Sequence, residues 1–230
     1  MTGLFMSKSK NSVEAVYGLL VQKILDMTIK PGEVVTEFSV AEKFGIGRTP
    51  VREALKRLES EGLIQTRNRT KTIQMLQSKD LEEIFDIKIL LESAVAGMAA
   101  IHGTAPQRDQ LRLVIRSMES FMRDRAQGQF CEEDCLQQWL ALDRSFHALV
   151  FEMAGNERIT KIIANLNLQW HRFKVGLMAI EDRLDKALGE HYSIGMAIID
   201  QNPAEAESAM REHLSSLKKV LSTLMKTFAA

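Results

Sequence analysis

The sequence predicts a mainly α-helical protein, with an N-terminal winged helix-turn-helix followed by an all-helical antiparallel bundle. Three observations support this fold class. Only four of the 230 residues are proline and 13 are glycine, and so few helix-breaking residues permit long helices. Apolar residues recur at helical spacing along most of the chain. Residues 63–75 depart from that spacing, and their alternation predicts two short strands.

The first domain is expected over residues 1–77. A turn at Lys30-Pro31-Gly32 ends its first helix. Thr36 and Ser39 are candidate caps of the second helix. Pro50 suits the first turn of the third helix. The expected elements are helices at about residues 12–27, 40–44 and 49–61 and strands at 63–66 and 71–75.

The second domain is expected over residues 78–230, where the pattern changes to long amphipathic helices. Asn202 and Pro203 form a cap and first-turn pair before the last of them. About 150 residues of this kind predict a helical bundle. We expect helices at about residues 79–101, 107–127, 132–154, 157–175, 181–200 and 203–227.

The composition indicates a globular protein of the reducing cytoplasm. Hydrophobic residues make up 45% and charged residues 26%, and no apolar run approaches the roughly 18 residues that span a membrane. No stretch of signal-peptide type begins the chain. Cys131 and Cys135 are too few for a disulfide framework. We expect them to be ordinary thiols rather than a redox pair or soft metal ligands.

Charge is unevenly distributed although the whole chain is neutral. Residues 1–76 hold twelve basic and eight acidic side chains, a net charge of +4, and the remainder holds 18 and 22, a net charge of −4. A basic head on an acidic body indicates an anionic partner for the head.

The third helix presents basic side chains on one face. Arg48, Arg52 and Lys56 are four residues apart and therefore lie on the same side of the helix. Such a face can enter the major groove of DNA, where arginine reads guanine and lysine neutralises phosphate. The tip Arg67-Asn68-Arg69 adds charge beside it. The spacing alone equally fits a solvated face with ion pairs along the helix.

Four polar residues of the second domain interrupt apolar stripes. Asp143 and His147 are four apart on one helix, and His191 and His213 each replace an apolar residue on another. His191 precedes Asn202 by eleven residues and His213 follows it by eleven, so an antiparallel hairpin places both rings at one level. Three imidazoles and a carboxylate in a bundle core predict a site for divalent zinc, nickel or manganese.

Three interpretations are open at this point. One is a regulator of transcription that contains a metal and responds to an effector. Another is a metalloenzyme that acts on a small carboxylic acid, since an open Asp/His₃ site can activate water. The chain has no glutamate placed as in a HExxH helix to serve as its base. The last is a DNA-binding dimer whose histidines are core residues without a metal.

Several motifs in the first domain resemble those of a known family. The chain is similar to the GntR family of bacterial transcription regulators, in its FadR-like branch. The resemblance implies binding of double-stranded DNA through Arg48 and Arg52, with Thr49 near the backbone. Gly47 stands where the family usually has Ser or Thr, and Thr70 where its wing usually has Gly. The motifs are Ile29-Lys30-Pro31-Gly32, Ala41-Glu42-Lys43-Phe44-Gly45, Arg48-Thr49-Pro50-Val51-Arg52-Glu53-Ala54-Leu55 and Leu58-Glu59-Ser60-Glu61-Gly62-Leu63.

The resemblance extends into the second domain, which is similar to metal-binding domains of the FCD type. It implies that Asp143 and the three histidines hold a metal and that a small organic acid binds beside it. Lys88, a candidate effector ligand, stands where the family commonly has arginine. A homodimer on a pseudo-palindromic operator is the expected assembly. The motifs are Asp80-Leu81-Glu82-Glu83-Ile84-Phe85-Asp86-Ile87-Lys88, Leu91-Glu92, Asp143-Arg144-Ser145-Phe146-His147, Ala154-Gly155-Asn156, Glu190-His191 and Arg211-Glu212-His213.

Overall fold

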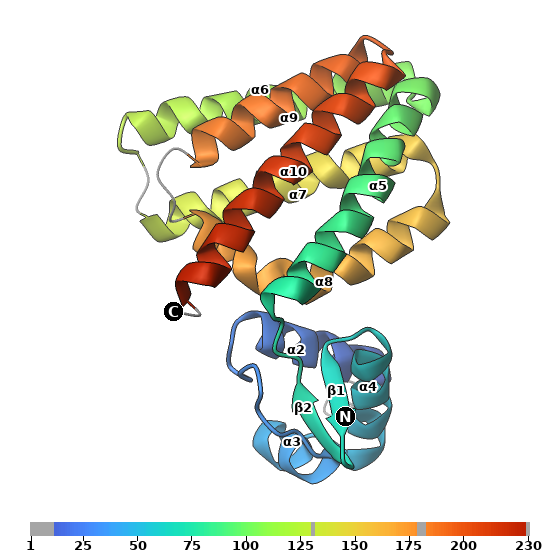
Figure 1. Ribbon diagram of the computed structural model, residues 1–230, viewed down its shortest axis with the longest axis vertical. Helices are drawn as coiled ribbons and strands as arrows, with labels where there is room; N and C mark the ends of the chain where they lie inside the picture. The colour runs from blue at the N-terminus through green and yellow to red at the C-terminus, as the bar shows by residue number, and fades with distance from the viewer. Residues whose placement is uncertain (1–11, 130–131, 179–182, 229–230) are drawn as a thin grey trace, which may run out of the picture. The chain divides into compact units, whose positions relative to one another are not determined.

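A computed structural model describes residues 12–129, 132–178 and 183–228 of the chain (Figure 1). Packing divides the described residues into two compact units. The first comprises those of Met1–Leu76 together with Asn167–Arg172, and the second comprises those of Gln77–Leu166 and Phe173–Ala230. The expected fold class is confirmed, since helices dominate and the one sheet of the described residues has two strands.

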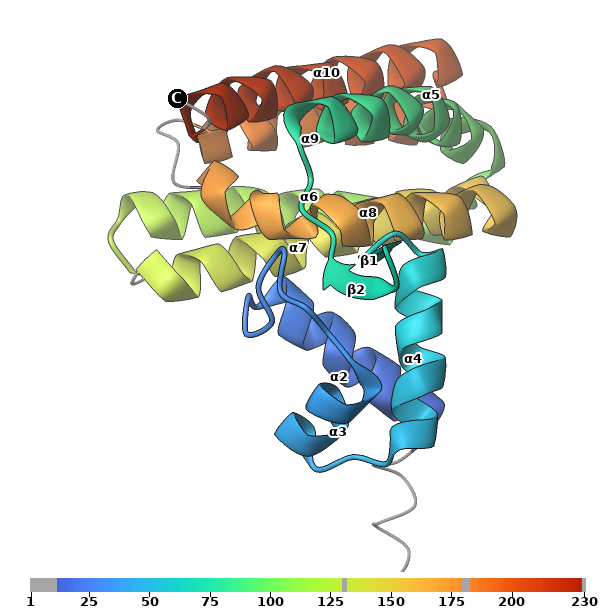
Figure 2. The ribbon, with the colours of Figure 1, turned by 60° about the horizontal axis from the view of Figure 1, so that its bottom comes forward.

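The first unit contains the helices α2 (Val13–Leu25), α3 (Glu37–Phe44) and α4 (Arg48–Ser60), which Figure 2 shows with the hairpin. Helix α2 begins after Ser12, whose side chain accepts the amide hydrogen of Ala15 at 3.2 Å. Helices α2 and α3 both pack on α4. The apolar stripes meet in a core that includes Val16, Leu20, Val40, Val51, Leu55 and Leu58.

Helix α3 begins three residues earlier than expected. Thr36 is its cap, and Thr36 and Ser39 form a capping box in which each side chain accepts the other's backbone N–H. Because Ser39 is thereby the third residue of the helix rather than a cap before it, the helix gains a turn. Gly45 ends it in the left-handed region at a φ of 65°.

The hairpin after α4 joins β1 (Ile64–Arg67) to β2 (Thr70–Ile73). The strands are antiparallel, with Ile64 opposite Ile73 and Arg67 opposite Thr70. Only two residues, Asn68 and Arg69, form the turn, and their φ angles are 49° and 64°. Two left-handed residues in a two-residue loop define a type I′ turn, whose twist matches that of the strands.

Gln74–Gln77 connect β2 to the first helix of the second unit, and both end residues of this segment are hydrogen-bonded. The backbone N–H of Gln74 donates to the carbonyl of Leu63 at 2.9 Å. Gln77 is the cap of the next helix, and its backbone N–H donates to Asp80 at 2.7 Å.

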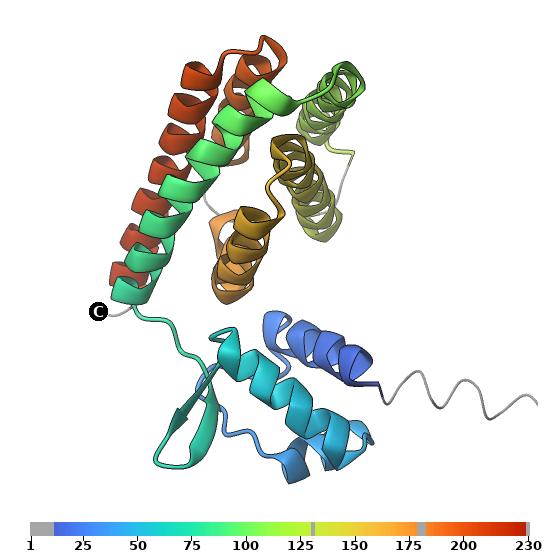
Figure 3. The same ribbon diagram turned by 90° about the vertical axis from the view of Figure 1, so that its right-hand side faces the viewer.

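The second unit consists of long helices that begin and end close to the expected positions. Helix α10 packs along α5 and α9, α7 packs on α5 and α6, and α6 packs on α9; Figure 3 shows α10 beside α5. Within the described residues, none of the helices combines the length and the apolar character needed to cross a membrane. The helices are α5 (Ser78–His102), α6 (Ala105–Ala126), α7 (Glu132–Ala154), α8 (Glu157–Met178), α9 (Arg183–Ile199) and α10 (Pro203–Phe228). Of α8, the segment Asn167–Arg172 belongs to the first unit.

Candidate functional site

The basic face predicted on α4 is exposed. Arg48, Thr49, Arg52 and Lys56 all lie at the surface, and the side chains of Arg52 and Lys56 are 50% and 62% exposed. Glu53 lies between these two, 3.5 Å from Arg52 Nε and 3.2 Å from Lys56 Nζ. Exposed pairs of this kind contribute little to stability, so a phosphate can take the place of the carboxylate.

Arg48 has a neighbour that the sequence did not reveal. Its guanidinium carbon lies 5.1 Å from the centre of the Phe38 ring, and Phe38, on α3, is 57% exposed. A cation over an aromatic face is attracted to it and loses some of its freedom. The contact therefore positions the first arginine of α4 while leaving it at the surface.

Arg57 lies on a different side of α4 and holds two helices together. Its guanidinium donates to Glu61 and Glu14, in each case at 3.0 Å, and stacks 3.7 Å from the centre of the Tyr17 ring. The Tyr17 hydroxyl donates to Glu61 at 2.6 Å. Burial and this hydrogen bond raise the pKa of Tyr17 to about 12. Arg57 is thus a structural residue that ties α4 to α2.

The wing tip is exposed at all three predicted residues, Arg67, Asn68 and Arg69. Thr70 is the first residue of β2 and does not enter the turn. Asn68 and Arg69 both take the left-handed conformation. An arginine at this position is unusual because a Cβ atom disfavours positive φ.

The candidate metal ligands of the bundle lie together. His147 and His191 approach each other with their Nε2 atoms 3.3 Å apart. Asp143 Oδ1 lies 3.5 Å from His191 Nε2 and 3.9 Å from His147 Nε2. One ring nitrogen from each of His147, His191 and His213 falls within 4.8 Å of the other two. The helices α7, α9 and α10 thus bring all four predicted residues to one place.

The turn between α9 and α10 sets the height of two of these rings. His191 and His213 have ring centres 4.8 Å apart, as their equal separation from Asn202 predicts. Asp143, His191 and His213 are 6%, 1% and 3% exposed. Burial lowers the pKa of His213 to about 4, aided by neighbouring His191 and opposed by Glu190. This imidazole is therefore neutral at pH 7, the form that binds metals.

The spacing of the donor atoms fits a metal ion. Zinc binds histidine nitrogen at about 2.0–2.1 Å, so two nitrogens on one tetrahedral zinc lie about 3.3 Å apart. The two Nε2 atoms of His147 and His191 have this separation, 3.3 Å. The carboxylate of Asp143 supplies a negative charge beside them. The donor set therefore suits a divalent transition metal.

Charged residues that were not among the predicted ligands lie beside the histidine cluster. His213 Nδ1 lies 2.8 Å from Glu190 Oε2, and both terminal nitrogens of Arg183 donate to that oxygen at 3.1 Å. His191 Nδ1 lies 2.6 Å from the carbonyl of Ala187. Burial raises the pKa of Glu190, but His213 and Arg183 outweigh it and lower the pKa to about 2. Glu190 directly precedes His191, and this adjacency was the available signal.

Lys88, the predicted effector ligand, is buried close to the cluster. Its side chain is 2% exposed, and its ammonium forms an ion pair with Glu92, which is also 2% exposed. The second oxygen of Glu92 lies 3.9 Å from His147 Nδ1. Lys88 and Glu92 are four residues apart, a spacing at which opposite charges pair along a helix.

Comparison with known proteins identifies both units. Residues 12–73 match the family described as bacterial regulatory proteins, gntR family, and residues 83–216 match the FCD domain. The chain belongs to the GntR family of bacterial regulators and carries an FCD domain. The predicted family is therefore confirmed.

Full-length relatives of this GntR-family protein are named as regulators. The uncharacterized HTH-type transcriptional regulator YdhC of Bacillus subtilis is 26% identical over 86% of this chain and 86% of its own length. The HTH-type transcriptional repressor RspR of Escherichia coli is 26% identical over 90% of this chain and 87% of its own. The chain is thus a DNA-binding transcription regulator, as predicted, and the alternative of a metalloenzyme finds no support among these relatives.

Solved structures share the fold of this GntR-family protein. Escherichia coli McbR/YncC covers 92% of this chain and 97% of its own, with a TM-score of 0.72 and 19% identity. The match to a GntR transcriptional regulator from Rhodococcus sp. RHA1 covers 94% of this chain and 97% of that chain, with a TM-score of 0.58 and 17% identity. At this level of identity, the likeness extends to the fold alone.

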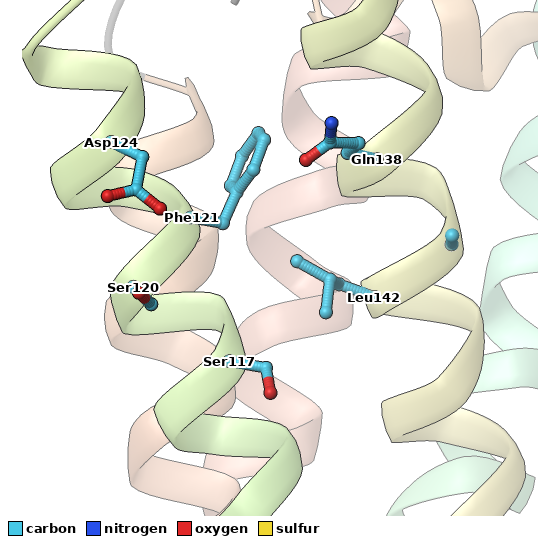
Figure 4. Close-up of a pocket in the computed structure, with 7 residues that line it drawn as sticks. Ser117, Ser120, Phe121, Asp124, Gln138 and Leu142 are labelled. Carbon is cyan, nitrogen blue, oxygen red and sulfur yellow. The ribbon is translucent and has the colours of Figure 1, made fainter. Parts of the chain in front are cut away.

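An open depression of about 410 Å³ lies between α6 and α7 of the GntR-family chain (Figure 4). Its lining includes none of the candidate metal ligands. The residues that line the depression are Ser117, Ser120, Phe121, Asp124, Gln138, Ala141 and Leu142.

Of the two cysteines, Cys135 is a partly buried free thiol, and Cys131 lies outside the described residues.

Proposed function

We propose that this GntR-family protein is a metal-containing transcription regulator whose DNA binding is modulated by a small organic acid. Residues 1–77 would bind DNA, and residues 78–230 would bind the metal and effector and form a homodimer. The observation that carries the proposal is the convergence of three histidines and Asp143 at distances typical of one bound ion. The site of action is the cytoplasm, where bacterial DNA lies.

The α4 face is the proposed reader of the operator. Arg48 and Arg52 are exposed on one side of the helix, the position from which arginine can donate two hydrogen bonds to guanine. Thr49 and Lys56 would contact the phosphate backbone. The wing residues Arg67, Asn68 and Arg69 would add phosphate contacts, since all three lie at an exposed tip.

Zinc is the metal we favour, with nickel or manganese as alternatives. Three imidazoles and one carboxylate complete the four-coordinate shell that zinc prefers. When a position in such a shell opens or the shell expands, a metal can bind a carboxylate from outside the protein. The buried ammonium of Lys88 is proposed to attract the effector. A lysine offers a compact positive charge, whereas an arginine could donate two parallel hydrogen bonds to a carboxylate.

A homodimer would place two reading helices on a pseudo-palindromic operator. One face of α5 supports this assembly, since Ile87, Leu90 and Ile101 are 45%, 65% and 59% exposed. Leu90 follows Ile87 by three residues and precedes Ile101 by eleven, close to three helical turns, so the three side chains form one stripe. We propose that a second copy of the chain covers this stripe.

Metal analysis of untagged protein tests the metal centre. We expect about one equivalent of zinc per chain from ligands of this type, and a loss of zinc in His191→Ala. His102→Ala is the matched control, because His102 is exposed at the end of α5. Zinc well below one equivalent in the wild type, with the same value in His191→Ala, would leave a DNA-binding dimer whose histidines are core residues.

A further inference from the structure

Each histidine of the cluster has a polar group facing its Nδ1 atom. For His191 this group is the carbonyl of Ala187 at 2.6 Å. For His213 it is Glu190 at 2.8 Å, and for His147 it is Glu92 at 3.9 Å. All three groups accept hydrogen bonds and none donates one. The acceptors lie within hydrogen-bond distance at His191 and His213, whereas at His147 the acceptor lies beyond it.

Two of these acceptors are carboxylates that are each held by a buried cation. Arg183 donates to Glu190 from both terminal nitrogens, and its side chain is 4% exposed. Lys88 pairs with Glu92, and both side chains are 2% exposed. The bundle thus contains two series of a cation, a carboxylate and a histidine, namely Arg183–Glu190–His213 and Lys88–Glu92–His147.

The arrangement determines which nitrogen carries the proton of a neutral ring. A carboxylate beside Nδ1 stabilises the tautomer with hydrogen on Nδ1, and the Nε2 lone pair is then available to a metal. The adjacent cation donates to the carboxylate and holds it on the Nδ1 side of the ring. Nδ1 of His191 faces the carbonyl of Ala187 and so carries the hydrogen. A hydrogen bond between the Nε2 atoms of His147 and His191, which lie 3.3 Å apart, therefore has His147 as its donor.

We propose that Glu190 is a positioning residue that fixes the tautomer and orientation of His213, with Arg183 holding its carboxylate. Glu92, held by Lys88, takes the same role at His147 once a metal orients that ring. The role in metal affinity rests on the proposed metal centre. Lys88 is thereby engaged inside the protein, and an effector carboxylate that reaches it must compete with Glu92. The 3.9 Å separation of Glu92 from His147 exceeds a hydrogen bond by about 1 Å, and we expect it to shorten when a metal orients the ring.

The tautomers can be measured without any metal. In ¹⁵N-labelled wild-type apoprotein, long-range ¹H–¹⁵N correlation spectra should show the Nδ1–H tautomer for His213. The Nε2–H tautomer at this residue would overturn the proposal. This measurement uses the native chain and does not depend on the stability of a variant. It also remains decisive if the wild type binds no zinc, an outcome that would remove the proposed metal centre alone.

Measurements of zinc affinity test how much Glu92 and Glu190 contribute to metal binding. Removal of an outer partner of a metal-bound histidine typically lowers affinity 10- to 100-fold. We expect losses of about this size for Glu92→Gln and Glu190→Gln when zinc is measured by competition with a chelator. Glu212→Gln is the matched control, because it removes the same charge next to His213 from an exposed side chain. It should change the affinity less than about twofold.

A structural role alone would give a different result. If the two carboxylates only stabilised the fold, Glu190→Gln would lower the melting temperature and leave the tautomer of His213 and the zinc affinity unchanged. The double variant Glu190→Gln/Arg183→Gln avoids an unpaired buried guanidinium, so it keeps the test open if the single variant unfolds. Wild-type zinc affinity in a folded Glu190→Gln protein or in this double variant would overturn the proposal.

Discussion

Arginines on the same helix serve different purposes, as the contacts of Arg52 and Arg57 illustrate. Arg52 is 50% exposed and lies 3.5 Å from Glu53. Arg57 contacts Glu14, Glu61 and Tyr17. The side chain of Arg52 is held less tightly and can rearrange around a base edge, whereas that of Arg57 fixes the helix that carries both.

Arg52→Ala should therefore abolish most sequence-specific DNA binding without unfolding the protein. A bidentate contact to guanine contributes about 1–3 kcal/mol, so we expect affinity to fall about ten- to hundredfold. Mobility shifts with a DNA fragment selected by the wild type from a random pool measure this. Lys161→Ala, which removes a charge from a 79% exposed side chain of α8, is the control. Wild-type affinity in Arg52→Ala would exclude it as a reader.

The wing turn gives a second prediction at the scale of one residue. Arg69 has a φ of 64°, and a side chain in this region costs about 1–2 kcal/mol relative to glycine. Arg69→Gly should raise the urea midpoint while weakening DNA binding through the lost charge. Arg67→Ala, which removes the same charge from β1, should weaken binding without the gain in stability. A fall in the midpoint for Arg69→Gly would contradict the assigned turn.

At the scale of helices and strands, the sequence predicted nearly every element and the four clustered residues. Repeating apolar positions and caps such as Asn202 are local signals, and they carried the predictions. The start of α3 was misplaced because Thr36 and Ser39 are both acceptable caps and only their mutual hydrogen bonds decide between them. Contacts between distant segments, such as Arg48 with Phe38 or Glu92 with His147, depend on packing that no local pattern encodes.

Two glycines of α9 allow a matched test of packing between helices. A Cβ atom on Gly195 would clash with Ile115 of α6, whereas one on Gly189 would meet nothing within 4 Å. Gly189→Ala should stabilise the protein by about 0.5–1 kcal/mol through helix propensity. Gly195→Ala should destabilise it by about 1–3 kcal/mol, the usual effect of overpacking. Urea unfolding measures both, and equal gains would contradict the close contact of α6 and α9.

At the scale of the whole molecule, the proposed dimer makes the exposed stripe on α5 testable. Leu90→Glu places a charge where a second copy should pack, so sedimentation should show a monomer and operator affinity should fall. Leu113→Glu is the control, since Leu113 on α6 is 60% exposed against 65% for Leu90. A wild-type monomer, or dissociation by Leu113→Glu alone, would place the interface elsewhere or remove it.

The segment that connects β2 to α5 is short. Four residues, Gln74–Gln77, separate β2 from α5, and a fully extended chain of that length spans only about 14 Å. Gln74 and Gln77 are both anchored by hydrogen bonds, which leaves Met75 and Leu76 between the two anchored residues. Under the proposed function, a movement of α5 near Lys88 and Glu92 would reach the wing strand through these four residues. We expect glycines inserted among them to weaken the effect of the effector on DNA binding.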